Sequence, residues 1–213
     1  MKVGILSESS SDEAAIRILA EAVLGSTLEI LPIRVRTRGC TALRATFSAA
    51  FKKLHWQPDA DGMIVVIDSD DSPVHIAAHE TTGFNDPDCR YCQMHRLVVE
   101  LRSLVAPRPQ APLNVSIGLA VPAIEAWYRC GLDIHSTEAH FSREAATRLV
   151  TLRRDLKRDA YGTFRAPQSV MTKKAIEHAE RLARDIPLLE RQFPGGFGPL
   201  ARSLRQWITT SMP

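Results

Sequence analysis

The chain has 213 residues, of which 45% are hydrophobic and 24% charged, with a formal net charge of +3. This composition is typical of a globular protein with its own core, and no apolar run approaches the roughly eighteen residues that a membrane-spanning helix needs. The net charge is too small to indicate nucleic-acid binding by itself, although acidic residues cluster near predicted strand ends and basic residues gather after Arg143.

Predicted strands and helices alternate along the first 127 residues. Short apolar runs indicate strands, and apolar residues recurring every three or four positions indicate helices. Ser10 followed by Glu13 has the pattern of a capping box, which predicts a helix start. The predicted elements are a strand at 2–7, a helix at 10–25, a strand at 28–35, a helix at 41–54, a strand ending at Asp68, a helix at about 93–104, a strand at 115–121 and a helix at 122–127.

This alternation predicts an α/β fold with a mostly parallel four-stranded sheet, helices on both faces, and ligands bound at the carboxyl ends of the strands. We expect this domain at residues 1–141, with a loop inserted at about 72–95, and a helical, basic extension at 142–213 packed on it. Since the N-terminus lacks the pattern of a secretory signal, we expect a cytoplasmic protein, not bound to membranes, whose four cysteines are reduced or bound to metal.

Acidic residues follow three of the predicted strands. Glu8 follows the first, Asp68, Asp70 and Asp71 end or follow the third, and Glu125 follows the fourth. The carboxyl ends of parallel strands meet at one edge of the sheet, so these carboxylates should converge there and repel one another without a cation. Oxygen ligands in this number suit Mg²⁺ or Mn²⁺, which also bind substrate phosphates.

Each of these acidic residues also has a structural interpretation. Glu8 could stabilise the positive end of the following helix dipole, and Asp12 could cap that helix. The acidic residues after the third strand could form a solvated turn, with Asp71 capping the loop. Glu125 has apolar neighbours, which indicates partial burial, so it could be a structural hydrogen-bond acceptor instead of a ligand.

The segments "ILSESSSDEAAI" and "VVIDSDD" resemble the Toprim domain of topoisomerases, primases and overcoming-lysogenization-defect nucleases. That domain has a glutamate after its first strand and an Asp-x-Asp after its third, and the resemblance covers residues 1–127. Within this group, "AVPAIEAWYRCG" and "MTKKAIEHAERLARDI" resemble stand-alone bacterial Toprim-like proteins, some of them associated with phage defence. The resemblance implies a Rossmann-like Toprim fold and metal-dependent phosphodiester chemistry, with catalytic Glu8, Asp68 and Asp70.

Two departures from the Toprim pattern favour hydrolysis over strand passage. Ser9 stands where a glycine usually follows the glutamate, and a tyrosine-nucleophile domain of the topoisomerase kind is missing. The resemblance therefore implies a nuclease, acting on DNA rather than RNA, with a partner ATPase or a second copy of the chain as further partners.

Two other classes of function remain open. A phosphatase of the haloacid-dehalogenase type also places Asp-x-Asp after a buried strand, with the first Asp as nucleophile. Its motif follows the first strand of the core, whereas here two strand units precede the motif and Glu8 would have no role. A subunit without catalysis, which binds nucleic acid or a partner protein, is the other alternative.

A second group of candidate ligands lies in "HIAAHETTGFNDPDCRYCQMH". Cys89 and Cys92 form a CxxC, followed by His95, and either His75 or His79 would complete a tetrahedral zinc site. A zinc ion would hold a loop of this length without a core. Loop thiols beside surface histidines are the alternative.

Basic residues form a third group. Arg34, Arg36 and Arg38 alternate along the second predicted strand and its exit, so they share one side and could bind nucleic acid. Lys173 and Lys174 open a later helix, where Lys173 could contact nucleic acid and Lys174 could neutralise the transition state of phosphoryl transfer. Further basic residues follow one another in the preceding predicted helix, and these could bind a phosphate backbone or form a solvated helix face: Arg148, Arg153, Arg154, Lys157 and Arg158.

Overall fold

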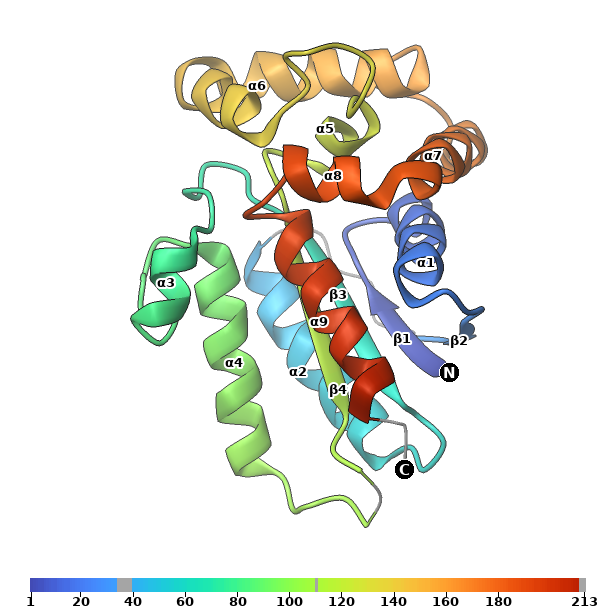
Figure 1. The fold of residues 1–213 in the computed structure, drawn as a ribbon, viewed down its shortest axis with the longest axis vertical. Coiled ribbons are helices and arrows are strands. Elements are labelled where there is room, and N and C mark those ends of the chain that lie inside the picture. The colour runs from blue at the N-terminus through green and yellow to red at the C-terminus, as the bar shows by residue number, and fades with distance from the viewer. Residues whose placement is uncertain (34–39, 110, 211–213) are drawn as a thin grey trace.

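The computed structural model describes residues 1–33, 40–109 and 111–210 and shows an α/β fold. Four parallel strands form one sheet in the order β2-β1-β3-β4 (Figure 1). The chain runs outward from β1 to β2 and then crosses to β3 on the other side of β1, so the winding reverses between β1 and β3. Ligands of such sheets bind beyond the carboxyl ends of the strands at this reversal. The strands are β1 (Lys2–Leu6), β2 (Glu29–Leu31), β3 (Gly62–Asp68) and β4 (Asn114–Ala120).

Most predicted elements are present, with shifted ends. The second strand is three residues long where eight were predicted, and the first long helix is capped by Ser9, whose hydroxyl accepts from the Asp12 N–H at 3.2 Å, instead of by Ser10. The predicted binding residues Arg34, Arg36 and Arg38 lie outside the described residues. The helices are α1 (Ser10–Leu24), α2 (Cys40–Trp56), α3 (Ala77–Thr81), α4 (Arg90–Leu104), α5 (Ile124–Tyr128), α6 (Glu138–Tyr161), α7 (Gln168–Leu182), α8 (Ile186–Gln192) and α9 (Phe197–Thr210).

Helices cover both faces of the sheet because side chains alternate along β3, which is buried throughout. Met63, Val65 and Ile67 belong to the core formed with α2 and α4, whereas Ile64 and Val66 belong to the core formed with α1, α7 and α9. The short helix α5 and the long helix α6 lie across the carboxyl ends of the strands (Figure 1). No helix among the described residues is long and apolar enough to cross a membrane.

The C-terminal helices complete the core of the α/β domain. A Cβ at Gly62 would lie 2.6 Å from the Trp207 ring, so the glycine is what lets α9 approach β3. The buried carboxylate of Glu138, at the start of α6, accepts hydrogen bonds from the N–H groups of Gly195 and Gly196 at 3.0 and 2.7 Å. This contact fixes the turn that leads into α9.

Replacing Gly196 by alanine should destabilise the protein by about 3 kcal/mol. The added Cβ would lie 2.1 Å from the Leu119 carbonyl oxygen and 3.0 Å from a Glu138 carboxylate oxygen, so the turn would have to move. Gly198→Ala is the matched control, since its Cβ would meet nothing closer than 3.5 Å. Urea unfolding measures both variants, and equal midpoints would contradict the close packing of this turn.

Candidate functional site

Four carboxylates from different elements interact where the winding of the sheet reverses. Glu8 and Asp68 lie at the ends of β1 and β3, which are paired in parallel register, so the two residues leave the sheet side by side. Asp12 comes from the first turn of α1, and Glu125 from the first turn of α5. We call these four residues the carboxylate cluster.

The main chain and side chain of Asp68 hold this region together. Its side-chain Oδ1 accepts a hydrogen bond from the Ile124 N–H at 3.1 Å, which joins the end of β3 to the start of α5. Its carbonyl oxygen accepts from Arg90 Nη1 at 2.9 Å. The side chain of Glu125 is buried on α5, as its apolar neighbours predicted.

The carboxylates of the cluster disfavour one another's charge. Burial, followed by the charges of Glu8, Glu125 and Asp12, raises the pKa of Asp68 well above its usual value. Burial and the charge of Glu125 raise the pKa of Asp12 to about 7. The pKa of Glu8 is raised by partial burial and by Asp70, and the arginines described next oppose this shift. A cation bound here would therefore relieve an unfavourable concentration of negative charge.

This charge predicts a pH-dependent stability. The folded state retains the Asp12 proton up to about pH 7, whereas the unfolded chain releases it near pH 4, so ionisation of Asp12 lowers the stability of the fold as pH rises through this range. In chelator, the free energy of unfolding of Asp12→Asn relative to that of wild type should rise by on the order of 2 kcal/mol from pH 5 to pH 8.

Denaturant unfolding at both pH values measures the gain. Burial lowers the pKa values of several histidines, whose contribution to the free energy of unfolding changes with pH in the opposite direction, and this contribution cancels in the difference between variant and wild type. Glu100→Gln, at an exposed position, is the control and should show no such gain. A difference between Asp12→Asn and wild type that does not change with pH would contradict the raised pKa of Asp12.

Two arginines bind the acidic turn that follows β3. Arg90 Nη1 lies 2.6 Å from Asp70 Oδ2, and Arg153 of α6 bonds to the other Asp70 oxygen and lies 3.4 Å from Asp68 Oδ2. Asp70 has a left-handed backbone, with a φ of 49°, and its side chain is paired with both arginines. Asp71, also predicted as a ligand, has a side chain that is 85% exposed and lies 3.9 Å from Arg90.

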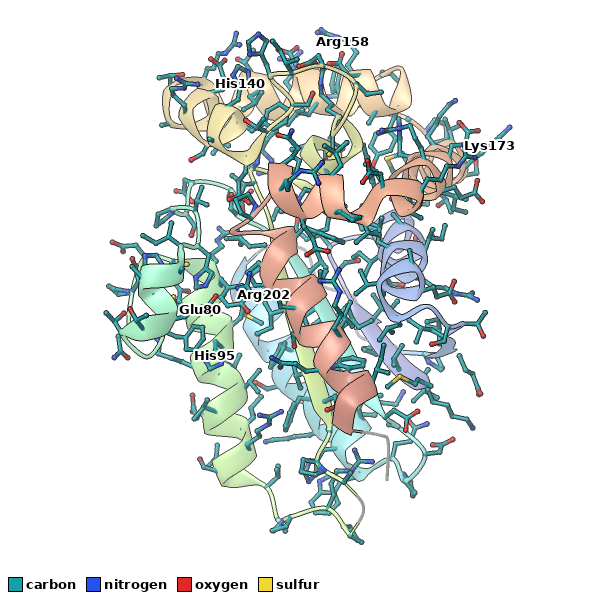
Figure 2. All side chains as sticks on the ribbon, viewed as in Figure 1. Glu80, His95, His140, Arg158, Lys173 and Arg202 are labelled. Atoms are coloured by element: carbon teal, nitrogen blue, oxygen red, sulfur yellow. The ribbon has the colours of Figure 1, made fainter. Side chains whose placement is uncertain are left out.

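The cations that bond to Asp68 and Asp70 are therefore arginines, and the predicted Lys174 is engaged elsewhere. Lys174 Nζ lies 2.7 Å from a carboxylate oxygen of Glu177 on its own helix. Lys173 lies on the outer side of α7 (Figure 2). The sequence indicated a basic helix around Arg153, but nothing in it distinguished this residue from its neighbours, and Arg90 had no signal at all.

A cavity of about 440 Å³ lies beside the acidic turn. It is lined on one side by Asp70 and Asp71 and on the other by α6, which includes a kink at Arg148. Small side chains of α6, among them Ala145 and Ala146, keep the space open. The cavity gives a ligand access to the turn from the α6 side.

A second cluster brings together the predicted zinc-type ligands. One ligand atom from each of His75, His79, Cys89 and Cys92 lies within 4.8 Å of every other, and we call these residues the His/Cys cluster. The Nδ1 of His75 lies 3.7 Å from both cysteine sulfurs. Ligands of a tetrahedral zinc ion with ordinary Zn–S and Zn–N bond lengths are about 3.6 Å apart, so this spacing fits a metal.

The two histidines are oriented as metal ligands usually are. His75 Nε2 lies 3.4 Å from Glu80, and His79 Nε2 lies 3.1 Å from Asp86, so each ring has a carboxylate behind it. The His79 Nδ1 is buried and has no partner among the described residues. Burial, together with the negative charge of Cys89, raises the pKa of Cys92 to about 12, so a thiolate there needs a cation.

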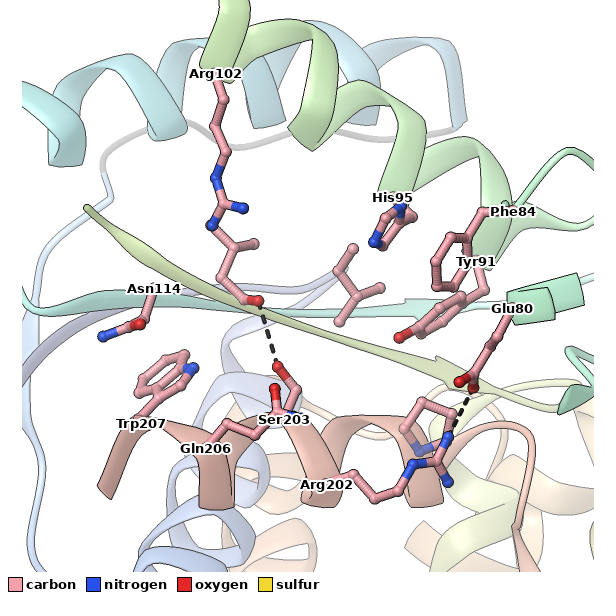
Figure 3. Close-up of a pocket in the computed structure, with 13 residues that line it drawn as sticks. Glu80, Phe84, Tyr91, His95, Arg102, Asn114, Arg202, Ser203, Gln206 and Trp207 are labelled. Atoms are coloured by element: carbon pink, nitrogen blue, oxygen red, sulfur yellow. Dashed lines mark hydrogen bonds and ion pairs between the residues drawn. The ribbon is translucent and has the colours of Figure 1, made fainter. Parts of the chain in front are cut away.

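The structure places His75 in this cluster where His95 was predicted. Cys92 is on the buried side of α4, whereas the side chain of His95 lines a neighbouring pocket between α4 and α9. There the His95 ring stacks on Phe84, with centroids 3.6 Å apart (Figure 3). The spacing CxxCxxH is therefore misleading here, because the fold brings His75 back from the loop before α3.

The same pocket connects the His/Cys cluster to the C-terminal helix. Glu80, which bonds to the His75 ring, also accepts a hydrogen bond from Arg202 of α9 at 2.7 Å (Figure 3). The inserted segment is thus held against α9 as well as against α4.

Comparisons with protein-family models, curated proteins and solved structures find no match to this chain.

Proposed function

We propose that the carboxylate cluster binds Mg²⁺ or Mn²⁺ and that the protein hydrolyses phosphodiester bonds of nucleic acid. The observation that supports this most directly is the position of Glu8 and Asp68, side by side where the winding of the sheet reverses, each with a raised pKa. The resemblance of the same residues to the Toprim motif supports the choice of phosphodiester chemistry.

The donor set suits a metal that keeps much of its water. Among the described residues, the His/Cys cluster is the one group of three or more ligand atoms within 4.8 Å, so the carboxylates do not form a closed cage. Mg²⁺ is commonly bound by one or two carboxylates, waters and substrate phosphates. Glu8 and Asp68 would be the protein ligands, and Asp70 would have to leave its arginines to join them.

The metal, when bound, would supply a Lewis acid and an activated water. Glu8 lies beside Asp68 and could accept a proton from the attacking water, and burial together with Asp70 raises its pKa, which makes it a stronger base than an exposed glutamate. Arg153, which contacts Asp68 and Asp70, is placed to neutralise charge on the phosphate. Arg90 binds the acidic turn through both a carbonyl oxygen and a carboxylate.

Asp70 favours this proposal over a phosphatase of the haloacid-dehalogenase type. That mechanism needs the second aspartate to carry a proton as general acid. Both Asp70 oxygens are bonded to arginines, so the side chain points to Arg90 and Arg153 and not toward a substrate as a general acid would. The carboxylates of Glu8 and Asp12 would also lack a role.

The proposal predicts cleavage that depends on a divalent metal. The full-length protein should cut plasmid or single-stranded DNA or RNA in Mg²⁺ or Mn²⁺, and an excess of chelator should stop the reaction. Gel electrophoresis of the products measures this. Cleavage that persists in chelator would contradict the metal mechanism, and binding without cleavage in either metal would indicate a subunit without catalysis.

We also propose a structural zinc ion in the His/Cys cluster. Two thiolates and two neutral imidazoles are a common structural zinc set, and four protein ligands would fill a tetrahedral ion and leave no open position for a substrate. Both cysteines are fully buried. The single carboxylate behind each histidine, Glu80 for His75 and Asp86 for His79, supports the same assignment. The ion would fasten residues 72–95 to α4 and, through Glu80, to α9.

A further inference from the structure

The C-terminal half of α6 carries two adjacent stripes of basic side chains. Arg153 bonds to Asp68 of the carboxylate cluster, and the charge of Lys157, one turn later, partly opposes the rise that burial causes in the pKa of Asp12, so this stripe faces the cluster. The second stripe consists of Arg154 and Arg158, which come directly after Arg153 and Lys157 in the sequence and so lie about 100° further around the helix. Both are exposed, and Arg158 lies on the outer side of the molecule (Figure 2).

An aromatic ring lies against the outer stripe. Phe164 follows the end of α6 and is 44% exposed. The guanidinium carbons of Arg154 and Arg165 lie 4.8 and 5.3 Å from the centre of its ring. Neither arginine has a carboxylate partner among the described residues, whereas Arg158 is paired with Asp155 at 2.8 Å. The ring therefore has two cations close to it that are free to bind an anion.

A hollow of about 450 Å³ opens beside this ring. It is lined by α6 and by the turn after it, and its volume is in the range of ligand pockets. Since Arg153 and Arg154 are neighbours on α6, this hollow and the carboxylate cluster lie on adjacent sides of one helix. The lining residues are Thr151, Arg154, Asp155, Arg158, Gly162, Thr163 and Phe164.

We infer that Phe164 stacks an unpaired nucleobase while Arg154 and Arg165 bind the adjacent phosphates. Every base has a face that can stack on an aromatic side chain, and arginine adds cation–π and phosphate contacts. Bases in a duplex are already stacked on one another, so an exposed ring in the turn after α6 selects single-stranded segments. The inference rests on the proposed function and extends it by naming unpaired nucleotides as the substrate class.

Binding without cleavage tests this inference. The protein is the full chain carrying Asp68→Asn, kept in chelator, and the probes are a fluorescent 12-nucleotide DNA, the same sequence as RNA, and the corresponding DNA duplex. Anisotropy should show that both single strands bind more tightly than the duplex. Phe164→Ala should weaken single-strand binding about five- to a hundredfold.

Three further variants separate stacking from charge. Phe164→Leu keeps an apolar side chain without a ring, so it should be nearly as weak as Phe164→Ala. Arg154→Gln should reduce the salt dependence of binding by about one phosphate contact, which Phe164→Ala should leave unchanged. Lys52→Gln, exposed on α2, is the control and should bind as the parent does. Thermal melts confirm that the variants are folded.

Two results would overturn the inference: equal affinity for single strand and duplex, or parental binding by Phe164→Ala. Failure of the proposed nuclease looks different. If the protein with Asp68 intact never cleaves but binding still depends on Phe164, the stacking site stands and the hydrolytic function is wrong. If the protein cleaves and Phe164→Ala binds and cleaves normally, the nuclease stands and the stacking site is wrong.

Discussion

Asp68→Asn should lower the rate of metal-dependent cleavage by a factor of about a thousand or more, equivalent to about 4 kcal/mol of transition-state stabilisation. Asp68 contributes the carboxylate at the end of β3, beside Glu8, and an amide cannot replace its charge as a metal ligand. The variant should stay folded, because Asn Oδ1 can still accept from the Ile124 N–H that Asp68 Oδ1 now bonds at 3.1 Å.

The thermal midpoint of Asp68→Asn in chelator should equal or exceed that of wild type. The pKa of Asp68 is raised by burial and by neighbouring carboxylates, so its charge costs stability at neutral pH and is absent in the variant. Asp59→Asn, near the amino end of β3, is the control and should cleave normally. A folded Asp68→Asn protein with parental cleavage would rule out the proposed mechanism.

Cys92→Ser should abolish zinc binding and strongly destabilise the fold. The purified protein should hold about one zinc ion per chain. When free zinc exceeds the dissociation constant of the site a thousandfold, loss of the ion should lower the free energy of unfolding by about 4 kcal/mol. Elemental analysis and thermal melts with and without chelator measure both effects. Cys130→Ala is the matched control, since Cys130 is a buried cysteine outside the His/Cys cluster.

A graded variant distinguishes metal loss from simple disruption of the core. Glu80→Gln should keep zinc but lower its affinity about ten- to a hundredfold, because Glu80 supports the His75 ring without touching the metal. His95→Ala should leave zinc content unchanged, since that ring packs on Phe84. Protein purified without chelator that contains no zinc, or Cys92→Ser protein that retains it, would refute the assignment.

The sequence was sufficient to predict the layers of the fold. Alternating strand and helix patterns predicted a parallel four-stranded sheet, and the uninterrupted apolar run before Asp68 predicted a fully buried strand. These are local properties, since the period of the apolar residues follows from the geometry of a single element. Element ends were less accurate, as the cap at Ser9 shows, because neighbouring serines offer nearly equivalent caps.

The same local patterns placed Glu8 and Asp68 at strand ends, and a parallel sheet brings such ends together. Which side chains complete the two sites depends on contacts between distant segments. Arg153 reaches Asp70 across 83 positions of the chain, and His75 meets Cys92 across 17, displacing the closer His95 from the expected set. Many basic or histidine residues fit such spacings equally well, and only the packing of α6 over the strand ends and of α3 against α4 decided which of them make contact.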